Sequence, residues 1–417
     1  MNKELVVISS PFDTVSGYGA RSRDIIRELI KSEKYNIRLL PQRWGNTPWG
    51  FCKDNPEWSY LYDYVLKPEE HQIKPDIFIQ ITIPNEFNPV GYYNIGITAG
   101  IENDICPPDW MEGLNRMDLN IVSSEHSKNV FQNTKYNKKI NGNVEELILN
   151  KPVKVLFEGV DTSTYNVIEE GLDVINNIPE DFCFLTLGHW LQGDLGEDRK
   201  NIGLTVKLFY EAFKNIKNQP ALILKTSFGN SSKISKHEVF KKIHEIKKLF
   251  KKEDQLPNVY LLNSDLKNSE INKLYNHPKI KSLISLTKGE GFGRPLLEFS
   301  FIGKPIISTY WSGQVDFLKK DNILPLKGEL KHVHPSSQNQ WLIKEGKWFN
   351  VNEDETKNAF RIMFNNYKKY LSKAGSQKKY VEENFTTDKM GEKLLNILNE
   401  NYKPQPQFKP LVLPNIL

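Results

Sequence analysis

The fold of this chain is decided by the stretch Thr287-Lys-Gly-Glu-Gly-Phe-Gly-Arg-Pro-Leu-Leu-Glu-Phe-Ser-Phe-Ile-Gly-Lys-Pro-Ile-Ile-Ser308. An apolar-leaning run of strand length, Lys281–Leu286, comes directly before it. Glycines then break the chain, and Pro295 fits the first turn of a helix, where its missing N–H has no cost. Gly303 and Pro305 fit the end of that helix, ahead of a second apolar run. The stretch therefore predicts a strand, a glycine loop, a short helix and a strand, which is the repeating unit of a parallel α/β sheet.

Two carboxylates bracket the glycine loop. Glu290 lies within it, and Glu298 follows one turn into the predicted helix, where it can face the same crevice. Small residues ahead of a helix leave backbone N–H groups free to bind an anion such as phosphate. The residues that would offer them are Gly291, Phe292 and Gly293. Because phosphate repels a nearby carboxylate, the two acids are better matched to hydroxyl groups of a ribose or a hexose. The plainer alternative is a glycine-rich turn with two solvated acids.

Length and composition limit the class of protein. The 417 residues suit two domains of α/β size, and 39% hydrophobic with 26% charged residues is typical of a soluble protein. No run approaches the roughly 18 apolar residues of a membrane span, and the N-terminus is expected to be a strand rather than a signal peptide. Three scattered cysteines form no metal spacing, so we expect a cytoplasmic, reducing location. A net charge of +5 suits phosphorylated ligands and leaves nucleic acid or an anionic membrane surface open.

A second glycine-containing loop follows the first predicted strand, Leu5–Ser9. Gly17 and Gly19 would let the backbone approach a ligand closely at the start of the next helix. A nicotinamide-dependent oxidoreductase is one alternative for this loop. Against it, the third glycine position holds Ser22, and no acid for a ribose diol follows the second strand, Asn36–Leu40.

Aromatic residues are dense between Arg43 and Tyr64, with Trp44 and Trp49 among them. Such side chains can stack on a sugar or a base, or they can close the edge of the first domain, and the sequence leaves both open. Further on, Glu102 lies in a loop after a predicted strand, which would border the ligand crevice of a parallel sheet.

The second half opens with a fresh buried strand over Asp181–Trp190. Its loop leads to Arg199 and Lys200, just before a helix. An adjacent basic pair is ordinarily a solvated surface feature, but its place between strand and helix favours binding of a diphosphate. The lysine-rich helix over residues 235–252 either covers the sheet or contacts a membrane or nucleic acid, the former being favoured.

With these residues in place, the chain resembles the retaining glycosyltransferases of family 4, which have the GT-B fold. Glu290 and Glu298 match the E-x7-E motif, with Pro295 and the Gly303-Lys304-Pro305 turn in register. The resemblance implies two Rossmann-like, doubly wound domains that face a cleft. They would comprise residues 1–165 on the acceptor side and 178–385 for the nucleotide-sugar, with the helix and tail of 386–417 crossing back.

The same resemblance implies roles for individual residues. Glu298 would hold the ribose of the donor and Glu290 the donor sugar. Lys200 matches the family's lysine on the diphosphate, and Arg199 is the substitute for its arginine. Many family members carry a histidine in the loop after the fourth strand; this chain has none there, and Glu102 is the nearest polar candidate. The remaining expected contacts are Gly17, Gly19 and Gly291–Gly293 to the donor, and Tyr18, Trp44 and Trp49 to the acceptor.

The resemblance implies a glycosyltransferase that moves a sugar from a nucleotide-sugar to an acceptor hydroxyl with retention. No D-x-D sits at a predicted strand end, so we expect no metal, and no cofactor besides the nucleotide-sugar. The acceptor stays open among glycan, lipid, protein, small molecule and modified nucleic acid. A GT-B protein that binds a nucleotide-sugar or glycan without turnover is the alternative.

Overall fold

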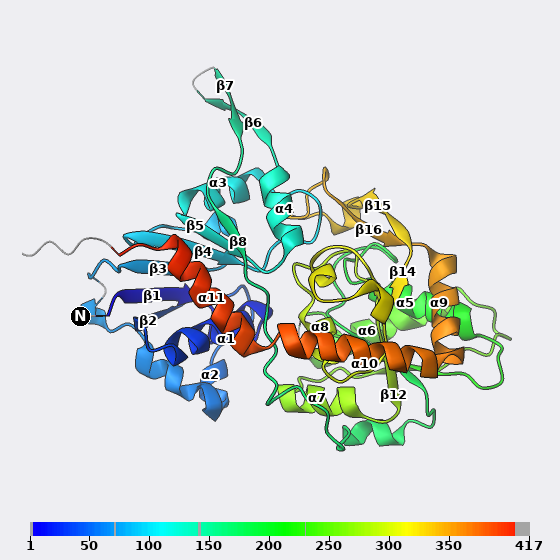
Figure 1. The fold of residues 1–417 in the computed structure, drawn as a ribbon. Helices are drawn as coiled ribbons and strands as arrows, with labels where there is room; N and C mark the ends of the chain where they lie inside the picture. The colour runs from blue at the N-terminus through cyan, green and yellow to red at the C-terminus, as the bar shows by residue number, and fades with distance from the viewer. Residues whose placement is uncertain (1–2, 71, 141–142, 230, 405–417) are drawn as a thin grey trace, which may run out of the picture.

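The structure is a computed structural model, and it describes residues 3–70, 72–140, 143–229 and 231–404 (Figure 1). The first half of the chain forms a six-stranded, fully parallel sheet. Its strands are β1 (Leu5–Ser10), β2 (Asn36–Pro41), β3 (Ile77–Ile81), β4 (Tyr93–Thr98), β5 (Leu119–Val122) and β8 (Val153–Val155). Their order across the sheet is β2-β1-β3-β4-β5-β8.

The second half forms another six-stranded parallel sheet. Its strands are β9 (Cys183–Leu187), β10 (Ala221–Lys225), β11 (Val259–Leu261), β12 (Ile280–Ser285), β13 (Ile306–Thr309) and β14 (Leu324–Leu326). Their order is β11-β10-β9-β12-β13-β14. The predicted unit is confirmed here: β12, the glycine loop, helix α8 (Arg294–Ser300) and β13 follow one another. Gly293 and Gly303, with φ of +102° and +75°, bound the helix in the left-handed region that glycine favours.

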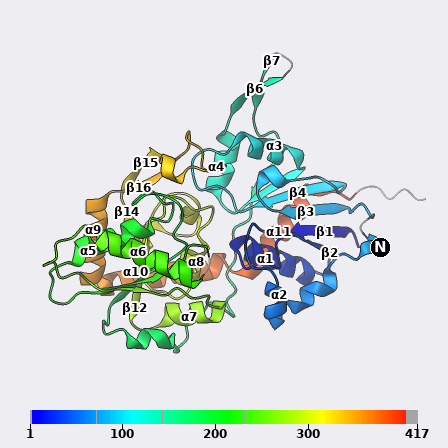
Figure 2. The same cartoon turned by 180° about the vertical axis from the view of Figure 1, so that it is seen from behind.

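Helices cover both faces of each sheet, so both domains are doubly wound (Figures 1 and 2). The first domain has α1 (Gly17–Lys31), α2 (Phe51–Asp54), α3 (Pro108–Arg116) and α4 (Glu125–Asn133). The second has α5 (Ile202–Phe213), α6 (Lys233–Lys247), α7 (Asn268–Asn276), α8, α9 (Glu353–Asn365) and α10 (Tyr367–Asn384). Separate apolar cores lie on the two faces of each sheet.

The strand orders locate the binding crevices. In each sheet the chain reverses its direction of winding beside the first strand, between β1 and β3 in one and between β9 and β12 in the other. Ligands of such sheets bind outside the carboxyl ends of the strands at this point. The glycine loop follows β12, and the loop that carries Gly17 follows β1. Both therefore lie at a reversal point.

The last helix, α11 (Thr387–Asn401), lies on the first domain although it follows the second in sequence (Figure 1). Its Met390, Leu394 and Ile397 belong to the same apolar core as α1 and the first sheet. Where the chain crosses, Val160 pairs with Thr386 as an isolated β-bridge. Of the helix and tail expected over residues 386–417, the part from 405 to 417 lies outside the described residues.

Two antiparallel hairpins complete the fold. β15 (Gly328–His332) pairs with β16 (Lys347–Val351) at the edge of the second domain. β6 (Tyr136–Ile140) and β7 (Asn143–Leu147) project away from the body of the first domain, as Figures 1 and 2 show.

The aromatic stretch after β2 mainly closes the first domain. Trp58 and Leu61, in a 3-10 helix over Pro56–Tyr64, are part of the core, and Phe51 packs against it. On the second domain, the lysine-rich helix α6 covers the sheet with Val239, Ile243 and Ile246. Helix α6 therefore packs on the sheet, as the favoured interpretation of the sequence predicts.

Candidate functional site

A cleft of about 390 Å³ lies between the two domains, at the carboxyl ends of both sheets. From the first domain it is lined by Gly17, Tyr18, Trp44, Ile83, Ala99, Gly100, Glu102, Trp110 and Glu158, and from the second by Arg199, Glu290–Pro295 and Trp341. The cleft thus brings together most of the residues singled out from the sequence.

One group of charged residues at the cleft, the Glu290 cluster, consists of Glu102, Arg199 and Glu290, which line the cleft, and Lys200, which pairs with Glu290. Lys200 Nζ lies 2.5 Å from Glu290 Oε1, and Arg199 Nη1 lies 3.3 Å from Glu290 Oε2. Arg199 Nη2 also lies 3.6 Å from Glu102 Oε1, so the arginine joins acids from both domains. Arg199 lines the cleft, and Lys200, which is not part of the lining, pairs with Glu290 behind it. The basic pair is therefore not a solvated surface feature.

Glu290 is ionised because of its two cations. Its burial alone raises the pKa, but Lys200 and Arg199 outweigh that effect and hold the pKa of Glu290 at about 2. Burial lowers the pKa of Lys200, and Glu290 opposes this. At neutral pH, then, the carboxylate is charged and held in place.

A second group, the Arg294 cluster, consists of Asp24, Arg294 and Glu298. Arg294 Nη1 donates to Asp24 Oδ2 at 2.8 Å, and Arg294 Nε donates to Glu298 Oε1 at 2.9 Å. Asp24 lies on α1 and Glu298 on α8, so this cluster also spans the two domains. Glu298 is 7% exposed and does not line the cleft. Its burial raises its pKa, while Arg294 acts in the opposite direction.

The loop Gly291–Gly293 separates the two clusters in the chain, since Glu290 directly precedes it and Arg294 directly follows it. Within the part of the chain that the structure describes, no hydrogen bond is donated by the backbone amides of these three residues. The loop approaches the other domain closely: Ser123 Oγ donates to Gly291 O at 3.3 Å. A Cβ added to Gly291 would stand 2.2 Å from Ala99 O, so only glycine fits here.

The loop after β1 contributes to the opposite wall. Nothing lies within 4 Å of a Cβ placed on Gly17, so the backbone there is open to a ligand. Gly19 is different, because its Cβ would meet Thr14 O at 2.3 Å, and it serves local packing. The Tyr18 ring stacks on Trp44 with centroids 3.9 Å apart, and both line the cleft. Trp49 is 48% exposed and does not line it.

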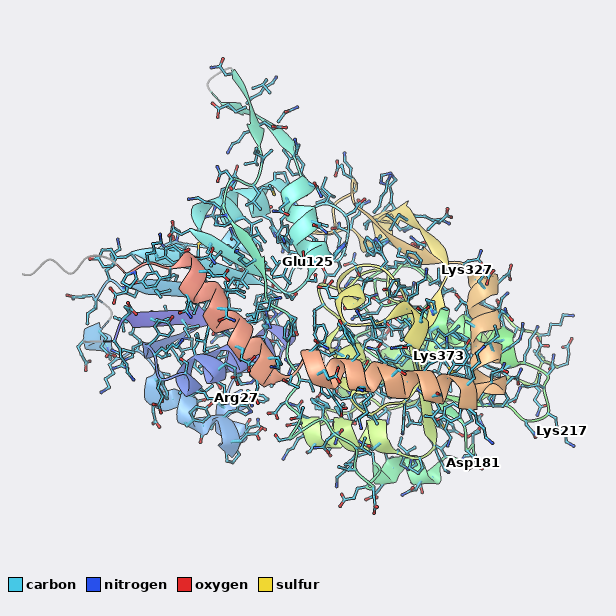
Figure 3. The ribbon with its side chains drawn as sticks, viewed as in Figure 1. Arg27, Glu125, Asp181, Lys217, Lys327 and Lys373 are labelled. Atoms are coloured by element: carbon cyan, nitrogen blue, oxygen red, sulfur yellow. The ribbon has the colours of Figure 1, made fainter. Side chains whose placement is uncertain are left out.

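Other contacts hold the domains together beside the cleft. Asp316 Oδ2 accepts from the backbone N of Glu125 at 2.9 Å; Glu125 begins α4 at the junction of the domains (Figure 3). His126 Nε2 lies 3.1 Å from Asn103 O, and the His126 and Trp311 rings form a T-shaped pair with centroids 4.8 Å apart. Burial lowers the pKa of His126 to about 4. The histidine is therefore a neutral part of the interface.

Sequence reasoning assigned no role to four residues that line the cleft: Trp110, Glu158, Arg294 and Trp341. For Glu158 a signal was available, because it directly follows the last strand of the first domain, at the carboxyl end of a parallel sheet. The tryptophans carried no such signal.

Two further features, a cluster of metal ligands and a membrane-spanning helix, are absent from the described residues. Among residues 3–404, apart from those the structure does not describe, no three His, Cys, Asp or Glu side chains gather to hold a metal ion. Within the same described residues, none of the helices combines the length and apolar character required to cross a membrane.

Comparisons with known proteins place this fold. No protein-family model matches the sequence, and no curated protein matches it by sequence. Among solved structures, sucrose-phosphate synthase from Thermosynechococcus elongatus is similar, with a TM-score of 0.63 and 10% identity over 96% of this chain and 99% of that one. Trehalose-6-phosphate synthase from E. coli, bound with UDP-2-fluoro glucose, has a TM-score of 0.59 and 10% identity over 96% of this chain and 100% of that one. HepE from Anabaena, in complex with UDP and glucose, has a TM-score of 0.55 and 14% identity over 95% of this chain and 100% of that one.

These neighbours are glycosyltransferases of the GT-B class. At such low identities the likeness shows the fold alone. The chain therefore has the GT-B fold, two Rossmann-like domains facing a cleft, as the sequence predicts.

Proposed function

We propose that this protein is a retaining glycosyltransferase that transfers a sugar from a nucleotide-sugar to an acceptor hydroxyl without a metal ion. The observation that carries the proposal is the arrangement around Gly291–Gly293. The backbone N–H groups of this loop donate no hydrogen bond within the described residues. The loop lies in the cleft of a GT-B fold, and in the chain it separates two clusters of acids and cations. Such a loop suits a diphosphate, and the acids on either side suit the hydroxyl groups of the sugar and the ribose.

Each cluster has a part in this proposal. Arg199 and Lys200 neutralise the leaving diphosphate together with the loop amides. Glu290 holds hydroxyls of the transferred sugar and Glu102 contacts that sugar from the opposite domain. Glu298 holds the ribose, with Arg294 giving way as the nucleotide enters. On the first domain, Gly17 shapes the donor side and Tyr18 and Trp44 form the acceptor side. Gly19 supports the loop by packing on Thr14, and Trp49 lies outside the cleft lining.

Retention is proposed to proceed by substitution on one face of the sugar. The bond from the anomeric carbon to the diphosphate oxygen breaks, the acceptor oxygen forms the new bond on the same face, and the departing phosphate oxygen takes the acceptor proton. A double displacement needs a carboxylate free to attack the anomeric carbon. Glu290 has both oxygens engaged by cations, which supports the single-step route.

The names of the neighbours suggest where to begin a donor screen. HepE and the trehalose-6-phosphate synthase were solved with UDP, UDP-glucose or a fluorinated UDP-glucose. UDP-glucose is therefore the first probe for this chain, followed by other nucleotide-sugars. A ligand at 100 times its dissociation constant adds about 2.7 kcal/mol of stability, which a thermal shift detects.

The decisive experiment follows the best donor. Hydrolysis of the donor, or transfer to a panel of glycan, lipid, protein, small-molecule and nucleic-acid acceptors, is measured, and the anomeric configuration of the product is read by NMR. An inverted product would overturn retention. Tight donor binding with neither hydrolysis nor transfer would instead favour a binding protein that keeps the fold.

A further inference from the structure

The cleft contains one buried carboxylate that nothing in the protein engages. Glu158 follows β8, lines the cleft, and is 8% exposed. Within the residues that the structure describes, it makes no hydrogen bond and no ion pair with either oxygen. Neither oxygen is among the fully enclosed polar atoms that lack a partner, so both are accessible from the cleft, where a donor on a ligand can bond to them.

The surroundings of Glu158 are charged but do not satisfy it. Arg21 is buried beside it, yet Arg21 Nη1 donates to Phe157 O at 2.6 Å and Nη2 donates to Leu156 O. Arg294 is already shared between Asp24 and Glu298. Burial raises the pKa of Glu158, and the two arginines act against that from a distance. The guanidinium groups that could pair with it are thus committed elsewhere.

The order of groups along the cleft indicates which ligand group reaches Glu158. A nucleotide-sugar carries hydroxyls at two places, on the transferred sugar and on the ribose, with the diphosphate between them. In the chain, the loop Gly291–Gly293 likewise separates the Glu290 cluster from the Arg294 cluster. With the sugar at Glu290, the ribose lies toward Arg294. The backbone on both sides of Glu158 contacts α1 around Asp24, because Arg21 donates to Phe157 O and Arg27 pairs with Asp161. Asp24 in turn pairs with Arg294, so Glu158 lies beside the Arg294 cluster, with Glu290 as a further charged neighbour.

We infer that Glu158 accepts a hydrogen bond from a ribose hydroxyl of the donor nucleotide and selects ribonucleotides over deoxyribonucleotides. This deepens the proposed function and rests on it. Glu158 comes from the first domain and Glu298 from the second, so a ribose held by both would bridge the domains. Of the two acids, Glu158 is the one that lines the cleft and has both oxygens free.

The test measures affinity by calorimetry for UDP and for its 2′-deoxy and 3′-deoxy forms, with wild-type protein and with Glu158→Gln. A hydrogen bond to a charged group corresponds to about tenfold to hundredfold in affinity. Wild-type protein is expected to bind UDP more tightly than one of the deoxy forms by that factor. Glu158→Gln should lose most of this preference and bind that deoxy form nearly as wild type does. Glu69→Gln is the matched control, because Glu69 is an exposed acid of the first domain that makes no hydrogen bond or ion pair with the described residues.

Other results overturn the inference. Equal affinities of wild type for all three ligands would do so, as would a preference for ribose that Glu158→Gln retains. If only the KM for the acceptor rises in Glu158→Gln, the residue belongs to the acceptor side. Should Glu158→Gln fail to fold, Glu158→Asp keeps the charge, withdraws it by one methylene, and should still weaken the preference. Wild type that binds no nucleoside diphosphate or nucleotide-sugar at all refutes the proposed function itself, a distinguishable outcome.

Discussion

Gly291 and Ala99 meet across the cleft so closely that a Cβ on the glycine would stand 2.2 Å from the alanine carbonyl oxygen. The two residues belong to different domains, so the glycine sets how near the domains come. An alanine at this position cannot be accommodated without moving a backbone carbonyl, because real Cβ atoms do not approach oxygen to that distance.

We predict that Gly291→Ala lowers turnover at least about tenfold, since a displacement of order 1 Å in an active site is enough to cost that much. Nucleoside diphosphate binding, which depends mainly on the second domain, should weaken less. Steady-state kinetics and calorimetry measure the two effects. Gly375→Ala is the control: it lies exposed in α10 with open space around its Cβ, and should stabilise the fold by about 0.5–1 kcal/mol. A Gly291→Ala enzyme of normal turnover would show that this contact is not needed for catalysis.

Glu290→Gln is expected to separate sugar binding from diphosphate binding. The change leaves Lys200 without its counter-charge and Arg199 with Glu102 alone, so affinity for a nucleoside diphosphate should stay the same or rise. Affinity for the complete nucleotide-sugar and turnover should both fall, turnover by about 100-fold or more if Glu290 acts in the transition state. Lower affinity for the diphosphate alone would contradict this placement of Glu290.

Glu102→Ala is expected to act mainly on turnover. Glu102 reaches the Glu290 cluster from the first domain through Arg199, so its contact with the sugar depends on how the domains are arranged. An interaction made chiefly in the transition state lowers kcat and leaves donor affinity little changed. Full activity of Glu102→Ala would contradict a contact between Glu102 and the sugar, and would leave its loop with only a structural role beside the cleft. If instead a covalent sugar adduct is trapped on either acid, the single-step route is wrong.

Stability should fall on mild acidification because of His126. Its pKa is about 4 in the folded protein, below its ordinary value of 6.5, so the unfolded chain binds the proton more readily. The contribution of the neutral histidine is fully present above pH 6.5 and is lost as pH falls toward 4. At pH 5.5 this loss amounts to about 1.4 kcal/mol. Denaturant unfolding from pH 7 to 5 should therefore show a smaller pH dependence in His126→Gln than in wild type. His237→Gln, at an exposed position, should leave the dependence unchanged.

Activity is predicted to survive a chelator. The expectation comes from the sequence, which has no D-x-D at a strand end, and from the cations Arg199 and Lys200 in the cleft. Dialysed protein is assayed with EDTA and then with manganese or magnesium. A rate that only the metal restores would assign neutralisation of the diphosphate to the ion, and the basic pair would need another role.

Several elements of this protein were predictable from local chemistry alone. The strand before Thr287, the glycine loop and the helix that Pro295 opens and Gly303 closes are each set by the residues within them. Two such α/β halves predict two parallel sheets, and parallel sheets place the loops after β1, β4 and β12 at binding edges. Short-range steric and hydrogen-bonding preferences suffice for all of this, because each involves neighbours in the chain.

The pairing of charges was decided only by the tertiary structure. The sequence puts Glu298 eight residues after Glu290, one turn into the next helix, but it does not tell that Arg294 donates to Glu298 or that Glu298 does not line the cleft. Nor does it tell that Arg199 meets Glu102 from another domain, or that Glu158 faces the same cleft without a partner. Electrostatic partners and burial depend on which loops two separately folded domains bring together. Residues that lie close together in the folded protein for this reason can be far apart in the sequence, so the sequence alone does not identify them as partners.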